Sequence, residues 1–223
     1  MNILLSGIVG STAYGLAHAG SDIDRLGLFA VATADLHGLH RPTESKVTTK
    51  PDRTLHEAAK WCRLALSCNP TAMELAWLPA ELYEVRTPLG DELIAIRDSF
   101  LSANAVRNAY LGYATHQIRK LQSRAQRPLD DEARARSAKH ARHVLRLLHQ
   151  GVGLHRTGEL TIRLSDPAAL RAEAERIVAE PPLGEAHLAR AEAEFTTPGV
   201  LPAQPDERPA EAWLRKVRAE FYG

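Results

Sequence analysis

Residues 10–29 of the chain read GSTAYGLAHAGSDIDRLGLF, and they contain the most informative pattern in the sequence. The apolar residues 3–9 lead into its Gly-Ser pair, which predicts a buried strand that ends in a tight turn. The Asp-Ile-Asp triplet then opens a second apolar run over residues 22–32. Alternate side chains of a strand share a face, so we expect Asp22 and Asp24 to point the same way and Ile23 to enter the core.

The two halves of this stretch predict complementary chemistry. Two neighbouring carboxylates repel each other unless a cation lies between them, so Asp22 and Asp24 indicate a hard divalent metal, most simply Mg²⁺. A turn at Gly10 and Ser11 offers backbone N–H groups and a hydroxyl that suit a phosphate. Phosphate, metal and carboxylates together predict phosphoryl or nucleotidyl transfer.

The overall composition excludes several classes of protein. The chain has 223 residues, 28 Lys and Arg against 27 Asp and Glu, and 44% hydrophobic residues, which fits one large or two small domains. A net charge of +1 excludes a histone-like protein and an acidic disordered tail. The mean hydropathy of −0.26, with no long apolar run, predicts no transmembrane helix and no membrane partner. Residues 3–5 lack the basic region of an export signal, and two cysteines without a CxxC motif favour a reducing cytoplasm.

The near-neutral total charge is unevenly distributed along the chain. Residues 115–163 carry eleven basic and four acidic side chains, a net +7, so the rest of the chain, with 17 basic and 23 acidic residues, is −6. The basic members are Arg119, Lys120, Arg124, Arg127, Arg134, Arg136, Lys139, Arg142, Arg146, Arg156 and Arg163. This pattern is typical of a phosphate-bearing partner held near metal-binding carboxylates, although a solvated arginine-rich helix surface explains it equally well.

Hydrophobic periodicity predicts an α+β chain in two parts. Short strands are expected at residues 3–9, 22–32, 45–49 and 52–55, and helices at residues 57–67, 71–77, 88–97, 103–126, 132–150, 166–180, 184–195 and 209–221. Pro128 separates the two long helices, and Gly151 and Gly153 are expected to end the second. We therefore predict a small mixed sheet with flanking helices in residues 1–99 and an all-helical part in residues 100–223.

Residues 10–29 also resemble the Gly-Ser…Asp-x-Asp signature of the DNA polymerase beta-type nucleotidyltransferase superfamily. The form Gly-Ser-x-Ala-Tyr-Gly followed by Ser-Asp-x-Asp-x-x-Gly is similar to predicted nucleotidyltransferases of an RNA repair pathway. The segments from Asp52 to Lys60 and from Asn69 to Glu74 resemble that family's middle block. The segments from Lys139 to Arg146 and from Thr157 to Glu159 resemble its helical block, so the likeness covers residues 3–163.

The resemblance implies a polymerase beta-like fold and a two-metal mechanism. Asp22 and Asp24 would be the catalytic carboxylates that bind two Mg²⁺ ions, for which Mn²⁺ can substitute. Asp52 is the favoured third catalytic and metal-binding carboxylate, and it would act as or orient the base for an acceptor hydroxyl. Glu44 and Glu57 compete for that role, but Glu57 is better placed to cap the helix that follows it.

The expected nucleotide-binding residues come from both parts of the chain. Gly10, Ser11 and Ser21 would hold phosphates, and Tyr14 either stacks on the nucleotide or packs in the core. Three cations on one helix face, at i, i+3 and i+7, would neutralise the triphosphate, or they are ordinary surface residues. They are Lys139, Arg142 and Arg146.

The acceptor of the nucleotide is left open by the sequence. An RNA end fits the resemblance and the basic segment over residues 115–163, whereas a protein hydroxyl would make the chain an AMPylating-type enzyme. A small-molecule acceptor has less support. The rival from another class is a non-catalytic nucleotide- or RNA-binding module of the same fold, against which the intact Asp-x-Asp pair argues. The preferred NTP, the oligomeric state and the role of residues 164–223 are not fixed by these patterns.

Overall fold

The computed structural model describes residues 1–125 and 130–223, and it divides into two compact units. The sheet unit comprises Met1–Ser102 and Gln204–Gly223, and the helical unit comprises Ala103–Ala203. Arg127 and Pro128, which the sequence analysis assigned to the basic segment and to a helix boundary, lie outside the described residues.

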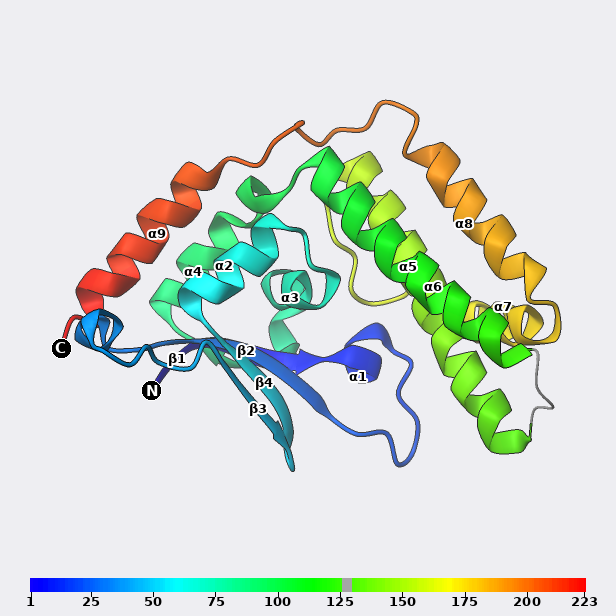
Figure 1. Ribbon diagram of the computed structural model, residues 1–223, viewed down its shortest axis with the longest axis horizontal. Helices are drawn as coiled ribbons and strands as arrows, with labels where there is room; N and C mark the ends of the chain where they lie inside the picture. Colours follow the sequence, from blue (N-terminus) through cyan, green and yellow to red (C-terminus); the bar gives the residue numbers. More distant parts are fainter. Residues whose placement is uncertain (126–129) are drawn as a thin grey trace. The chain divides into compact units, whose positions relative to one another are not determined.

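The sheet unit is built on five strands in the order β3-β4-β2-β1-β5 (Figure 1). The strands are β1 (Asn2–Val9), β2 (Asp24–Ala30), β3 (Ser45–Thr49), β4 (Asp52–Glu57) and β5 (Tyr83–Arg86). The pairing of β2 with β4 is parallel, and the other three pairings are antiparallel. The four strands expected from the sequence are therefore present. Strand β5 was not predicted, because its four residues alternate in burial and lack the apolar run that marks a strand.

Short helices follow the strands of this unit, and Figure 1 shows α2, α3 and α4 on one side of the sheet. Their bounds are α1 (Gly10–Tyr14), α2 (Ala58–Leu66), α3 (Pro70–Glu74) and α4 (Pro88–Ala95), with 3₁₀ turns at Thr33–His37, Leu75–Trp77, Ala80–Leu82 and Arg97–Phe100. Side chains cap three of the helices, with Glu57, Asn69 and Thr87 accepting bonds from first-turn N–H groups. Cys62 and Cys68 are buried free thiols, and burial raises the pKa of Cys62 to about 12.

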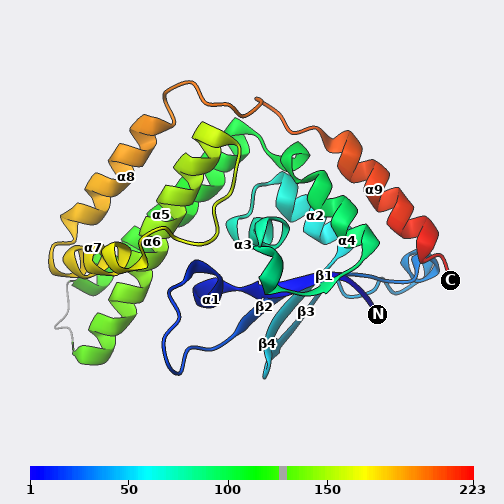
Figure 2. The ribbon, with the colours of Figure 1, turned by 180° about the vertical axis from the view of Figure 1, so that it is seen from behind.

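The last helix, α9 (Glu207–Glu220), packs in the sheet unit against α2 and α4 (Figure 2). Trp213 Nε1 donates to the Leu89 carbonyl at 2.8 Å, and the Arg218 guanidinium lies 2.7 Å from a Glu57 carboxylate oxygen. We expected residues 100–223 to form one helical part, whereas the structure groups the last twenty residues with the sheet. The buried indole and the ion pair give the physical reason, since neither is visible as a local sequence pattern.

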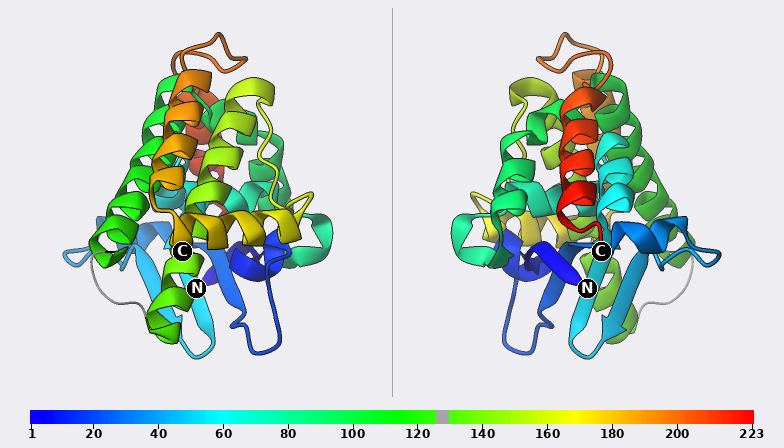
Figure 3. Two further views of the ribbon diagram at one scale, coloured as in Figure 1. Left: turned by 90° about the vertical axis from the view of Figure 1, so that its right-hand side faces the viewer. Right: turned by 90° about the vertical axis from the view of Figure 1, so that its left-hand side faces the viewer.

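The helical unit contains α5 (Ala103–Ala125), α6 (Asp131–Thr157), α7 (Pro167–Ala179) and α8 (Pro182–Glu194). Helices α5 and α6 run side by side, and α6 also packs on α7 and α8 (Figure 3). The prediction that Gly151 and Gly153 end α6 is wrong, because the helix continues to Gly158, whose φ of 74° is a left-handed cap. Gly151 instead permits close packing, since a Cβ there would lie 2.7 Å from Tyr110 Cβ.

The architecture confirms the predicted α+β class, with a mixed sheet and flanking helices followed by a largely helical part. No helix in the described part of the chain is both long and apolar enough to cross a membrane.

Candidate functional site

The end of β1 and the start of β2 meet at one edge of the sheet. Val9, the last residue of β1, pairs with Asp24, the first residue of β2. The Gly-Ser turn after Val9 and the carboxylate of Asp24 are therefore neighbours in space, although about a dozen residues separate them in the chain. This antiparallel pairing brings together the two halves of the motif that the sequence suggested.

Gly10 lies against the Asp24 carboxylate. Its φ is +68°, a conformation that costs an L side chain energy, and an added Cβ would lie 2.2 Å from Asp24 Oδ2. The absence of a side chain thus lets the carboxylate lie directly against the turn. Ser11 follows as the second residue of α1 and is half-buried, and its carbonyl accepts a bond from Leu16 N at 2.8 Å.

Asp22 does not lie on the strand as expected. Strand β2 begins at Asp24, so Asp22 stands in the preceding loop, where it is exposed, and Ile23 is 45% exposed rather than buried. The reason is that β1 ends at Val9 and turns into α1, which leaves residues 22 and 23 without a β1 partner. The expectation that Ile23 enters the core is therefore wrong.

The loop before Asp22 has its own hydrogen bonds. Ser21 donates its N–H to the His18 carbonyl, and its hydroxyl accepts from His18 N, both at 2.9 Å. Ser21, a predicted phosphate ligand, thus closes a turn through backbone groups of His18. Its hydroxyl keeps a proton to donate, since only its oxygen is used here.

Asp52 begins the strand beside the one that Asp24 begins. Arg25 pairs with Arg53 across the parallel strands, so the residues one position earlier, Asp24 and Asp52, start at the same edge. Neighbouring strands are about 4.8 Å apart, which brings the two residues close in the sheet. This register favours Asp52 as the third carboxylate.

The two competing acids lie away from Asp52, Glu57 at the other end of β4 and Glu44 just before the start of β3. Glu57 pairs with Phe29 at the far end of β4, about 16 Å along the strand from Asp52. It is buried, caps α2 by accepting from Ala59 N at 2.9 Å, and lies 2.7 Å from the Arg218 guanidinium. Glu44 accepts a bond at its carbonyl from Glu57 N at 2.8 Å, and its carboxylate pairs with Arg63 at 2.5 Å. The predicted capping role of Glu57 is confirmed.

The donor atoms at this edge fit Mg²⁺ in kind. Asp22, Asp24 and Asp52 supply carboxylate oxygens, which are the ligands that this ion prefers. Because Gly10 has no side chain, the Asp24 carboxylate can occupy the space that a Cβ would otherwise fill. Within residues 1–125 and 130–223, no three acidic, histidine or cysteine side chains lie close enough together to form a metal cluster. The residues therefore suit the ion by their chemistry, but in the described structure they do not form a metal cluster.

Arg25 is a site residue that sequence reasoning missed. Its Nε donates to Glu84 Oε1 on β5 at 2.8 Å, and its NH1 donates to the Ile23 carbonyl at 3.4 Å. The side chain thereby ties the Asp-x-Asp segment to the sheet. A basic residue directly after the two acids was a visible signal, but its partner lies on β5, which the pattern did not predict.

Tyr14 belongs to the core rather than to the exposed surface of the site. Its ring is 9% exposed, and its hydroxyl donates to Oε1 of the buried Glu74. Of the two alternatives for Tyr14, packing or stacking on a nucleotide, the structure favours packing. Glu74 was missed as its partner because 60 residues separate the two in sequence.

The three predicted cations of α6 do not share one exposed face. Lys139 is exposed and Arg142 is half-buried, whereas Arg146 is only 2% exposed. Arg146 donates to Gln150 Oε1 at 2.6 Å and approaches His143 Nδ1 at 3.0 Å. Arg146 is thus a buried polar residue of the helical unit, because residues i and i+7 of a helix that packs on three others need not both face solvent.

Comparison with known proteins relates the chain to a protein family. Residues 1–192 match the family described as "RlaP: RNA repair pathway DNA polymerase beta family". This range includes the whole Gly-Ser…Asp-x-Asp stretch, β4 with Asp52, and α5 to α7. A search among curated proteins found no match to the chain.

Proposed function

The chain belongs to the RNA repair pathway DNA polymerase beta family, and from this premise we propose that it is an Mg²⁺-dependent nucleotidyltransferase. The reaction moves a nucleoside monophosphate from an NTP to an acceptor hydroxyl and releases pyrophosphate. The preferred acceptor is an RNA end, in keeping with the description of the family.

The observation that carries this proposal is the contact between the Gly10 turn and the Asp24 carboxylate. Phosphoryl-type transfer needs a phosphate-holding turn next to carboxylates that bring a divalent cation to the same phosphate. The 2.2 Å separation between a Cβ built on Gly10 and Asp24 Oδ2 reports how closely these two groups approach.

In this proposal, each residue at the sheet edge has a separate task. Asp22, Asp24 and Asp52 hold Mg²⁺, which when bound neutralises the charge on the reacting phosphate. Ser11 and the backbone of the Gly10 turn hold the terminal phosphates, and Ser21 donates its hydroxyl proton to the same group. Arg25 positions the acidic segment through the Ile23 carbonyl.

The proposed chemical step is an in-line displacement at the α-phosphorus. The acceptor oxygen forms a new bond to phosphorus while the bond to the bridging oxygen of the β-phosphate breaks, and pyrophosphate carries away that electron pair. Asp52 takes the proton of the acceptor hydroxyl. Of the predicted α6 cations, Lys139 is exposed, and we assign it to contact with the phosphates of an RNA acceptor.

The test measures transfer of label from each α-labelled NTP to a pool of RNA, with metal removed by EDTA and then restored as Mg²⁺ or Mn²⁺. Asp22→Asn and Asp24→Asn should each abolish metal-dependent transfer. Asp35→Asn, an exposed acid elsewhere in the sheet unit, is the matched control and should keep it. Metal-independent labelling, or equal labelling by all four proteins, would refute the proposal.

The same assay distinguishes the acceptors. Label on a co-purifying protein, with none on RNA, would support a protein-modifying nucleotidyltransferase instead. Nucleotide binding without any transfer would support a non-catalytic module. For an RNA acceptor, Lys139→Gln should weaken RNA binding and flatten its dependence on salt, whereas Lys216→Gln on α9, outside the residues that match the family, should leave both unchanged.

A further inference from the structure

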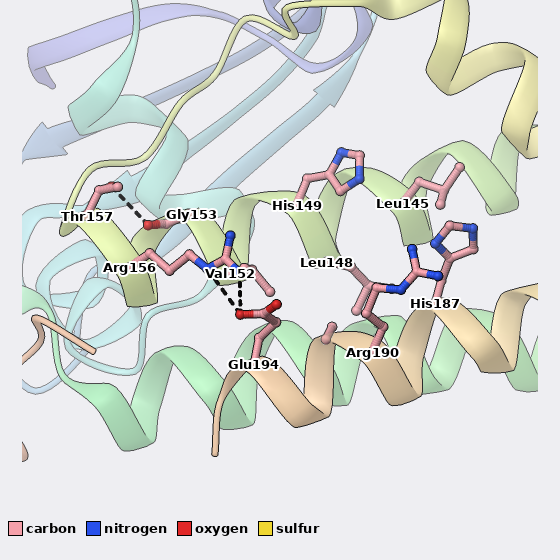
Figure 4. Close-up of a pocket in the computed structure, with 11 residues that line it drawn as sticks. Leu145, Leu148, His149, Val152, Gly153, Arg156, Thr157, His187, Arg190 and Glu194 are labelled. Carbon is pink, nitrogen blue, oxygen red and sulfur yellow. Dashed lines mark hydrogen bonds and ion pairs between the residues drawn. The ribbon is translucent and has the colours of Figure 1, made fainter. Parts of the chain in front are cut away.

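A pocket in the helical unit lies between α6 and α8, remote in sequence from the Gly10–Asp24 motif (Figure 4). Its volume is about 480 Å³, within the range of about 300–1,000 Å³ that is usual for small-molecule sites. The walls come from Leu145 to Thr157 on α6 and from His187 to Glu194 on α8. No step of the proposed transfer reaction uses these residues.

One end of the pocket is cationic. Arg190 and His187 project from α8 side by side, and His149 lines the pocket from α6 (Figure 4). His187 Nε2 is 2.8 Å from Glu173 Oε1, so this ring nitrogen already has a carboxylate partner. In the chain as described, no carboxylate forms an ion pair with Arg190. A guanidinium that lines a pocket in this way is suited to an anion, which it can bind with two parallel hydrogen bonds.

The floor of the pocket is apolar. Leu145, Leu148 and Val152 on α6 face Ala191 on α8. A concave apolar surface beside a few placed polar groups is the usual composition of a small-molecule site. The pocket therefore offers one environment for the body of a ligand and another for its charged group.

The opposite end is closed by an ion pair between the helices. Arg156 Nε donates to Glu194 Oε2 at 3.1 Å, and a second guanidinium nitrogen contacts the same oxygen (Figure 4). Glu194 thereby neutralises the charge of Arg156. In the described part of the chain, the positive charge that remains for a ligand in the pocket is that of Arg190. The asymmetry predicts one orientation for a ligand.

Space in the pocket is preserved by a glycine. Gly153 lines it, and a Cβ built there meets no atom within 4 Å. Glycine is a poor helix former, costing about 1 kcal/mol relative to alanine in a helix interior. An open, solvent-reachable glycine at this point of α6 therefore weakens the helix locally while leaving the cavity wide.

We propose that this pocket binds a small organic anion, whose apolar or planar body lies between α6 and α8 and whose phosphate or carboxylate contacts Arg190. The phosphate could belong to a mononucleotide and the carboxylate to an aliphatic acid, which are two sources of the same chemistry. The inference does not depend on the proposed nucleotidyl transfer.

The experiment titrates the full chain with adenosine monophosphate, octanoate or inorganic phosphate, by calorimetry in EDTA so that metal-dependent nucleotide binding is suppressed. Arg190→Gln removes the cation, and Arg171→Gln on the exposed side of α7 is its control. Gly153→Leu fills the pocket, and Gly112→Leu on α5 is its control, since a Cβ at Gly112 also meets nothing within 4 Å. Both glycine variants should raise helix propensity, so loss of folding does not confuse the result.

The expected result is that adenosine monophosphate or octanoate binds the wild type, and that Arg190→Gln and Gly153→Leu each weaken it about tenfold or more while the controls do not. Whichever of the two ligands binds identifies the source of the anion. Inorganic phosphate should bind much more weakly, because it lacks the apolar body. The proposal is overturned if neither organic anion binds, if the pocket variants bind as the wild type does, or if inorganic phosphate binds equally well.

Discussion

The Asp24 carboxylate lies against the backbone of Gly10, so closely that a Cβ on Gly10 would stand 2.2 Å from Asp24 Oδ2. The pairing of Val9 with Asp24 sets this contact, because it places the end of β1 beside the start of β2. A glycine is required here twice over, once for its φ of +68° and once for the space that the carboxylate fills. The candidate site therefore depends on the register of two strands as much as on its acids.

Gly10→Ala should impair both stability and transfer. A left-handed alanine costs about 1–2 kcal/mol, and the clash with Asp24 must displace the carboxylate from the turn. Gly20→Ala is the matched control, because Gly20 has a φ of +88° but a Cβ there meets nothing within 4 Å. Chemical denaturation should show that the left-handed backbone lowers the free energy of unfolding by a similar amount in both variants. Gly10→Ala should lower it further because of the clash with Asp24. Its kcat/KM should fall by about a hundredfold, as expected for a displaced catalytic group, whereas that of Gly20→Ala should change little.

Much of the sheet unit could be predicted because its signals are local. The apolar runs that became β1 and β2, the turn at Gly10 and the capping role of Glu57 each depend on a few consecutive residues. The proposal of Asp52, rather than Glu44 or Glu57, as the third carboxylate is of a different kind. It required the parallel register of β2 and β4, in which Arg25 lies opposite Arg53 and Phe29 opposite Glu57. Strand register is a tertiary property, so composition and periodicity could not supply it.

The errors share the same physical origin. Ile23 was expected in the core because it alternates with two acids. The pairing of β1 with β2 begins only at Asp24, so Ile23 lies outside the sheet. Arg146 was expected to share an accessible helix face with Lys139 and Arg142 because of their spacing, but α6 packs against other helices and buries Arg146 beside Gln150. Helix α9 was grouped with the helical part because no local signal shows that Trp213 packs under the sheet unit's α4. In each case long-range packing overrode a local pattern.

Tyr14→Phe should destabilise the fold without weakening nucleotide binding. The Tyr14 hydroxyl donates to the buried carboxyl group of Glu74, and removal of one partner of a buried hydrogen bond costs about 1–3 kcal/mol. Tyr83→Phe is a suitable comparison, because its hydroxyl donates to the neutral Leu75 carbonyl at 2.9 Å and its loss should cost about 0.5–1.5 kcal/mol. Thermal and denaturant unfolding report the stabilities, and the KM for NTP reports binding. A raised KM with unchanged stability would instead assign the Tyr14 side chain to the nucleotide.

The ion pair between Glu57 and Arg218 should be the main electrostatic attachment of α9 to the sheet unit. The Glu57 side chain is 5% exposed and that of Arg218 is 19% exposed, so Arg218→Met leaves a buried carboxylate without its cation and should cost about 3–5 kcal/mol. The control is Arg215→Met, one turn away on the same helix. In its pair with Glu211, the Arg215 side chain is 79% exposed and that of Glu211 is 56% exposed. This pair should therefore contribute at most about 1 kcal/mol to the free energy of unfolding. Equal denaturation midpoints for the two variants would show that the Glu57–Arg218 pair has no special weight.

His143 should make the protein less stable as the pH falls. Burial, followed by the charges of Arg146 and other nearby cations, lowers the pKa of His143 to about 3, and its Nδ1 lies 3.0 Å from an Arg146 guanidinium nitrogen. In the unfolded chain the same ring takes up a proton near its ordinary pKa of about 6.5. Between these two values the unfolded state binds more protons than the folded state, so this contribution to stability is complete above about pH 6.5 and declines toward pH 3, by up to about 1.4 kcal/mol for each pH unit.

The measurement is the free energy of unfolding at a series of pH values from about 7 to about 5, where this contribution should change by up to about 2 kcal/mol. His143→Gln should flatten the dependence because it removes one of the titrating groups. The pKa values of His56 and His149 are also lowered, chiefly by burial, so part of the slope should persist in the variant. His116→Gln, at an exposed position of α5, is the control and should keep the wild-type slope. If His143→Gln kept it as well, the His143 ring would have to accept a proton in the folded state, and the account of Arg146 as its buried cationic neighbour would be wrong.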